Sequence, residues 1–96
     1  MTKTKEITKA TDLFSENEIN YSAGDYTGKV MILSPKCLLP QYRTRANLLW
    51  RAGGGFGCDP TKIGRAVFAT CIGDGESARW DRNDFVGEFI GALPVS

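Results

Sequence analysis

The sequence predicts a mainly β domain, with an α+β arrangement as the open alternative. We expect a small five-stranded antiparallel sheet, either an SH3-like barrel or a curled open sheet, with one or two short helical turns. Three observations favour it. Residues 29–33 form a short continuous apolar run. Two β-rich segments, 65–72 and 77–81, flank a glycine turn. A single-turn breaker at 82–84 then leads to a short closing strand at 86–90, an order found in small barrels.

The first 26 residues are polar and show little periodicity. Thr11 or Asp12 could cap a short helical turn that runs through Leu13, Phe14 and Ile19. We therefore divide the chain into a poorly specified N-terminal segment, a β-rich core domain and a C-terminal tail, which span residues 1–26, 27–91 and 92–96.

The first core strand is predicted at 29–33, and Ser34-Pro35 then predicts one helical turn, which Pro40 limits. The second strand is predicted at 47–52, because the three glycines at 53–55 lose much backbone entropy on ordering and should end it. We expect a bulged or wide turn there, with Phe56 tucked onto the core.

The segments 65–72 and 77–81 predict a β-hairpin around Gly73-Asp-Gly75. Strand alternation should send Trp50 and Trp80 inward and Arg51 and Arg79 outward. We also expect Phe68 to be a core residue, and a 3₁₀ turn at 82–84 to direct Phe85 into the core.

Composition narrows the function classes. A chain of 96 residues has room for one hydrophobic core, so a binding site should lie on its outside or in a shallow groove. The sequence lacks an apolar run long enough for a membrane helix or a secretory signal, so we expect a cytoplasmic protein that does not enter the membrane. Three cysteines without a close pair, in a chain with no histidine, indicate reduced thiols, no structural zinc and no metal or other cofactor.

The glycine-rich loop and the late acidic residues do not predict an enzyme. Neither the phosphate-binding nor the dinucleotide-binding glycine spacing is present at 53–57. A set of acids, Asp74, Glu76, Asp81, Asp84 and Glu88, suggests Mg²⁺ ligands, but each also has an ordinary role in a turn or on a solvated face. We therefore expect a non-enzymatic protein.

The middle of the chain resembles a known family over about residues 28–90. The matching positions are Leu33-Ser-Pro, Leu38, Tyr42-Arg-Thr, Asn47-Leu-Leu-Trp, Gly54-Gly-Phe-Gly-Cys-Asp-Pro60, Gly64-Arg-Ala-Val-Phe, Asp74-Gly-Glu76, Trp80 and Arg82-Asn-Asp-Phe85. They resemble small proteins of unassigned function encoded on conjugative and other mobile elements of gut Firmicutes. The resemblance implies an accessory role in plasmid maintenance or in evasion of host defence, and it carries over no catalytic residue.

Basic charge is concentrated in the core. Residues 28–82 carry nine Lys or Arg and four Asp or Glu, which gives a net charge of +5, whereas the two flanking segments are mildly acidic. The candidate binding residues are Arg43, Arg45, Arg51, Lys62, Arg65, Arg79 and Arg82. The preferred hypothesis is an interaction module of mobile-element origin that binds a protein partner, such as a host-defence component. The alternative is a small β-barrel that binds nucleic acid through a basic strand face, and ordinary solvated charge is the plainest explanation of these residues.

Overall fold

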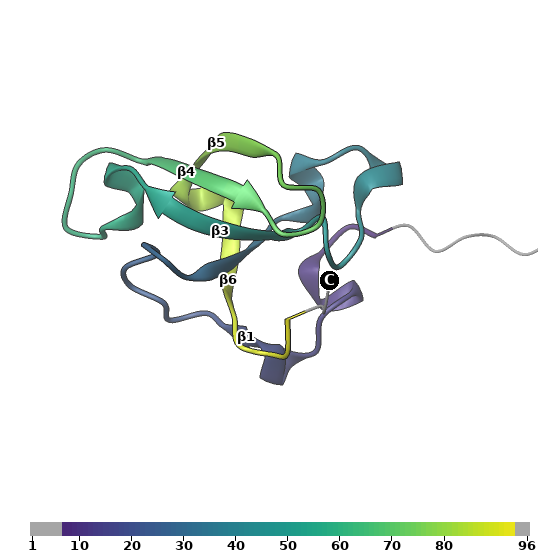
Figure 1. Cartoon of the computed structure of the whole chain (residues 1–96). Coiled ribbons are helices and arrows are strands. Elements are labelled where there is room, and N and C mark those ends of the chain that lie inside the picture. The colour runs from purple at the N-terminus through teal and green to yellow at the C-terminus, as the bar shows by residue number, and fades with distance from the viewer. Residues whose placement is uncertain (1–6, 94–96) are drawn as a thin grey trace, which may run out of the picture.

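The protein forms one open antiparallel sheet of six strands in the order β1-β6-β2-β3-β4-β5 (Figure 1). This is a computed structural model, and it describes residues 7–93. The strands are β1 (Ile19–Asn20), β2 (Val30–Leu33), β3 (Leu49–Gly54), β4 (Ala66–Cys71), β5 (Ser77–Asp81) and β6 (Phe85–Phe89).

The helical elements are three-residue 3₁₀ turns. They are η1 (Ala10–Asp12), η2 (Glu16–Glu18), η3 (Pro35–Cys37), η4 (Pro40–Tyr42), η5 (Phe56–Cys58) and η6 (Arg82–Asp84). Within residues 7–93 no helix has the length and apolar character needed to cross a membrane. The mainly β prediction is therefore confirmed for the described chain.

The core is enclosed by a strongly bent sheet. Figure 1 shows β6 running steeply across the direction of β3 and β4. All four residues of β2 are buried, Met31, Ile32 and Leu33 completely, so both faces of this strand are covered. The prediction of a buried strand from the continuous apolar run is thus confirmed, because a strand that is covered on both faces needs no polar side.

Of the two arrangements expected for the sheet, an SH3-like barrel and a curled open sheet, the closed barrel does not form. In residues 7–93, β1 and β5 end the sheet on its two sides and do not pair with each other, so the sheet is open. The five expected strands are present with ends shifted by up to two residues, and β1 is an additional strand that pairs with β6 through Ile19 and Phe89. This added strand occupies the edge that a barrel would use for closure.

The N-terminal segment contributes to the core from residue 10 onward. Ala10, Phe14, Ile19 and Tyr26 are all buried, and the Phe14 ring meets Phe89 edge to face at 5.5 Å between centroids. The expected single helical turn is instead two 3₁₀ turns that precede a strand. The buried residues of this segment are four to seven positions apart and separated mostly by polar residues, so short turns can direct each one to the core without a regular helix.

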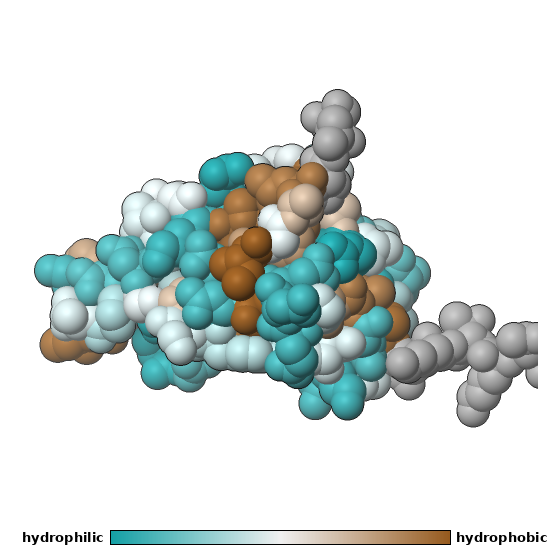
Figure 2. All heavy atoms as spheres, turned by 90° about the horizontal axis from the view of Figure 1, so that it is seen from below, coloured by the Kyte–Doolittle hydropathy of each residue, from teal (hydrophilic) through white to brown (hydrophobic). Residues whose placement is uncertain are grey.

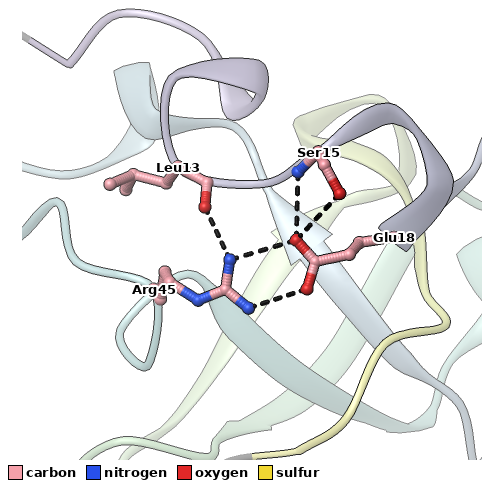
Figure 3. Close-up of polar contacts among 4 residues, drawn as sticks. All are labelled: Leu13, Ser15, Glu18 and Arg45. Atoms are coloured by element: carbon pink, nitrogen blue, oxygen red, sulfur yellow. Dashed lines mark hydrogen bonds and ion pairs between the residues drawn. The ribbon is translucent and has the colours of Figure 1, made fainter.

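Arg45 fixes this segment to the rest of the domain (Figure 3). Its guanidinium donates to the Leu13 carbonyl oxygen at 2.6 Å and to both carboxylate oxygens of Glu18, at 3.1 and 2.9 Å. The same carboxylate accepts the backbone N–H of Ser15 at 3.0 Å. The guanidinium carbon also lies 4.7 Å from the centre of the Phe14 ring. A side chain predicted to bind a partner therefore holds two parts of this chain together.

The glycine segment extends β3 instead of ending it at residue 52. Strand β3 continues to Gly54, and its register against β4 shifts between Ala52 and Gly54, which confirms the expected bulge. Gly55 has φ +105°, and a Cβ there or at Gly57 would overlap the backbone of the 65–66 segment. The connection therefore lies directly on the start of β4, and Phe56, which we expected on the core, is 67% exposed.

The β4–β5 hairpin has the predicted strands, and Gly75 has φ +77° in its turn. Trp80 pairs with Val67 and packs against Trp50 edge to face, with ring centroids 5.3 Å apart. Phe68 is consequently on the opposite face, 54% exposed, and its predicted place in the core is wrong. Phe85 follows η6 into the core as expected.

Candidate interaction face

One side of β3, β4 and β5 faces solvent and carries an exposed aromatic ring together with two exposed arginines. We call this side the outer face; its members are Arg51, Gly53, Ala66, Phe68, Thr70, Ser77, Arg79 and Asp81. Cross-strand pairing places Phe68 directly opposite Arg79, and Thr70 between Arg51 and Ser77. The outer face therefore has an aromatic ring near its centre with an arginine on each side of its strand.

The outer face continues into an apolar rim at the β3–β4 connection. Phe56 is 67% exposed and Ile63 is 99% exposed. A Cβ on Gly64 would meet the Phe56 side chain, and one on Gly55 would meet the Phe68 ring at 3.1 Å, so these glycines let both rings lie close to the loop backbone. Figure 2 shows exposed apolar atoms at the end of the molecule that carries this connection.

Four of the seven predicted basic residues are exposed on or beside the outer face. They are Arg51, Lys62, Arg65 and Arg79. Arg65 is paired with Asp81, its Nε lying 3.1 Å from Oδ2, whereas Arg51 and Arg79 make no hydrogen bond or ion pair with any residue from 7 to 93. Backbone N–H donation from Asn83, together with Arg65, lowers the pKa of Asp81, so this carboxylate is ionised and already engaged.

The other three basic residues hold the fold together. Arg82 donates to the carbonyl oxygens of Gly57, Cys58 and Gly24 at 2.8, 3.1 and 2.8 Å, and its guanidinium carbon lies 4.1 Å from the Tyr26 ring centre. Arg43 donates to the carbonyl oxygens of Leu38 and Ile7. With Arg45 described above, these side chains cross-link segments remote in sequence, and the structure does not bring the seven residues into one patch.

Two shallow hollows of opposite charge flank the hairpin. One, of about 360 Å³, is lined by Arg65, Ala66, Arg79, Trp80 and Asp81. The other, of about 350 Å³, lies at the hairpin turn and is lined by Leu38, Tyr42, Asn47, Trp50, Cys71, Asp74 and Glu76. The first has two arginines against one carboxylate, which is itself paired with Arg65, so it favours an anionic group.

The acidic residues and the thiols are used within the fold. Asp81 and Asp84 cap η6, and Asp74 accepts the backbone N–H of Glu76 at 2.9 Å. Across residues 7–93 no group of three metal-ligating side chains is assembled. All three cysteines are free; burial raises the pKa of each, that of Cys37 to about 11, so their reactive thiolate forms are disfavoured.

Sequence reasoning missed Phe56 and Phe68 as candidate binding residues. The sequence carried a signal for Phe68: Val67, Ala69 and Cys71 alternate with Phe68 and Thr70, and the structure buries the first set. The exposure of Phe56 depends on how the glycine connection folds back, which no local pattern encodes.

Comparison with protein-family models, with curated proteins and with solved structures finds no match to this chain.

Proposed function

We propose that the chain is a non-enzymatic module, built as an opened relative of the small SH3-like barrel, that binds a protein partner through its outer face and apolar rim. The observation that carries this proposal is the half-exposed Phe68 beside Arg79, with exposed Phe56 nearby. Aromatic and arginine side chains dominate the binding energy of protein interfaces, because they bury large areas and still offer polar contacts.

The surroundings of these residues support a binding role over a purely structural one. The domain gains little from a half-exposed Phe68, since burial of apolar area is what stabilises a fold. Arg51 and Arg79 have no partner among residues 7–93, so their charge is available to another molecule. The resemblance to mobile-element proteins makes host-defence components the first class of partner to screen.

The test is a pull-down with matched variants of the tagged, folded protein from a bacterial lysate. Phe56→Ser with Phe68→Ser removes the two exposed rings, whereas Ile90→Ser removes an exposed apolar side chain elsewhere, at 55% exposure. We expect a partner recovered by the natural chain and by Ile90→Ser, and lost with the double variant. Equal recovery by all three proteins would contradict the proposal.

A second candidate function, binding of single-stranded nucleic acid, is favoured by one observation. Arg51 and Arg79 flank Phe68 on neighbouring strands, and such binders combine an aromatic stacking surface with cations along the backbone path. A mobility shift with a single-stranded oligonucleotide at low salt tests it. The candidate requires a shift that salt weakens and that Arg51→Glu with Arg79→Glu abolishes.

A further inference from the structure

Strand β5 is the open edge of the sheet. It pairs with β4 alone, through five residue pairs from Ala66 with Asp81 to Thr70 with Ser77, and no register shift interrupts them. The opposite edge, β1, is only two residues long. Among residues 7–93, β5 therefore offers the longest strand edge without a neighbour, and Figure 1 shows it at the upper rim of the sheet.

The unpaired backbone groups of this edge can be assigned from the hairpin ladder. Cys71 donates its N–H to the Glu76 carbonyl oxygen at 2.7 Å, and Arg82 donates to Arg65 at 2.8 Å. Because bonded and non-bonded pairs alternate along an antiparallel ladder, the N–H and C=O groups of Ser77 and Arg79 point away from β4. The Asp81 N–H is already taken by Asp84 Oδ2 at 3.0 Å.

The usual devices that block a strand edge are few here. Strand β5 has no proline and no bulge, and the charged residue at its centre is Arg79. If two copies paired antiparallel about this position, Arg79 would face Arg79, and like charges directly opposite each other are destabilising. Pairing about Trp80 would instead set Asp81 opposite Arg79, but the Asp81 N–H and carboxylate are already engaged by Asp84 and Arg65. A carboxylate of another protein opposite Arg79 would be favourable without disturbing these contacts, so the edge favours an acidic segment of another protein over a second copy of this chain.

From this geometry we propose that β5 binds an extended segment of the partner protein as an added strand, with Asp or Glu opposite Arg79. The inference rests on the proposed function and names the mode of binding. Side chains next to the acidic residue would turn to the other face of the sheet, where Ala78 and Trp80 are only partly buried at the core's edge. The segment should therefore read apolar, acidic, apolar.

One further observation agrees with an added strand at this place. The hollow of about 360 Å³ beside β5 includes Arg65, Arg79 and Trp80, so a neighbouring strand would have space and charge complementarity. A strand laid against β5 would also add the backbone hydrogen bonds on which strand addition depends.

A phage library of random twelve-residue peptides, selected on the full chain, tests the inference. We expect enriched peptides to alternate apolar and acidic residues, and we expect a synthetic copy to slow hydrogen exchange at the Ser77 and Arg79 amides. Ser77→Pro removes one outward N–H and should weaken binding by about tenfold or more, whereas Ser77→Ala, which keeps it, should change binding by less than about twofold. Arg79→Glu should lower the affinity about tenfold, and a peptide with Lys for its central Glu should restore it.

The outcomes separate the two proposals. Peptides that bind without protecting Ser77 and Arg79, or that lose affinity only with Phe56→Ser and Phe68→Ser, would overturn strand addition and leave the proposed function intact. An empty selection beside a partner recovered from lysate would do the same. No peptide and no lysate partner would overturn both, and so would binding of a single-stranded oligonucleotide alone. If Ser77→Pro unfolds, hydrogen exchange and the Arg79→Glu charge swap still decide the question.

Discussion

The two sides of the β4–β5 hairpin carry the same kinds of side chain in opposite environments. Trp80 packs on Trp50, and Arg82, which follows β5 as the first residue of η6, donates to three carbonyl oxygens of the domain. Phe68 and Arg79, in contrast, lie exposed on the outer face. Residue type therefore does not separate the stabilising members from the candidate binding members. The side of the sheet to which each residue points separates them. The comparison can be tested with one aromatic pair, Trp80 and Phe68, and one arginine pair, Arg82 and Arg79.

The largest effect is expected at the inner aromatic residue. Trp80→Ala should lower the free energy of unfolding by about 3 kcal/mol, since it removes a large packed ring and the edge-to-face contact with Trp50. Denaturant unfolding measures this loss. Trp80→Phe is the control: it keeps an aromatic ring, removes the Nε1–H that has no acceptor among residues 7–93, and should cost less than half as much. If Trp80→Ala were as stable as the natural protein, Trp80 could not be counted among the residues that stabilise the inner side.

The inner arginine should have the next largest effect. Arg82→Ala removes a donor from the carbonyl oxygens of Gly24, Gly57 and Cys58, of which the Cys58 oxygen keeps the Tyr26 N–H at 2.9 Å. Hydrogen bonds to a charged group contribute about 1.5 to 3 kcal/mol. We expect a loss of about 2 kcal/mol by denaturant unfolding, with Arg82→Lys recovering only part of it because an ammonium group cannot reproduce the planar fork. If the denaturant midpoint of Arg82→Ala equalled that of the natural protein, Arg82 would contribute no more to stability than an exposed arginine.

Arg45 extends the inner class to the N-terminal segment, and its carboxylate partner makes it sensitive to pH. The side-chain hydrogen bond from Arg45 lowers the pKa of Glu18 from 4.5 to about 2, so the pairing stabilises the fold fully above about pH 4.5 and is lost as the pH falls through about 2. The melting temperature of Glu18→Gln should therefore lie below that of the natural chain at pH 6 by a small margin.

That margin should close as the pH approaches 2, because the protonated carboxyl of Glu18 no longer differs in charge from the amide of glutamine. Thermal melts of both proteins at pH 6, 4 and 2.5 measure it. A difference in melting temperature that stays constant over this range would show that the Glu18 charge contributes nothing to holding the segment.

Much of this arrangement follows from local sequence, and the part that does not has an identifiable cause. The hairpin, η6 and the buried β2 were predicted because alternation, turn glycines and a continuous apolar run each act over a few residues. Strand β1 was missed since Ile19–Asn20 is too short for a pattern and exists through pairing with β6. The roles of Arg43, Arg45 and Arg82 depend on carbonyl groups 5 to 58 residues away, which charge counting does not reveal.

The smallest effect on stability, and the sharpest separation of the two sides, is expected at the outer members. Phe68→Ala and Arg79→Ala should each change the free energy of unfolding by no more than about 0.5 kcal/mol, because both side chains are exposed. Denaturant unfolding of the two variants beside Trp80→Ala and Arg82→Ala measures the contrast. If Phe68→Ala proved as costly as Trp80→Ala, the ring would be stabilising the sheet and its exposure would no longer favour a binding role. If both outer variants keep their stability and lose the lysate partner, the two sides differ in function as well as in burial, since the same hairpin would then hold the fold with one face and bind with the other.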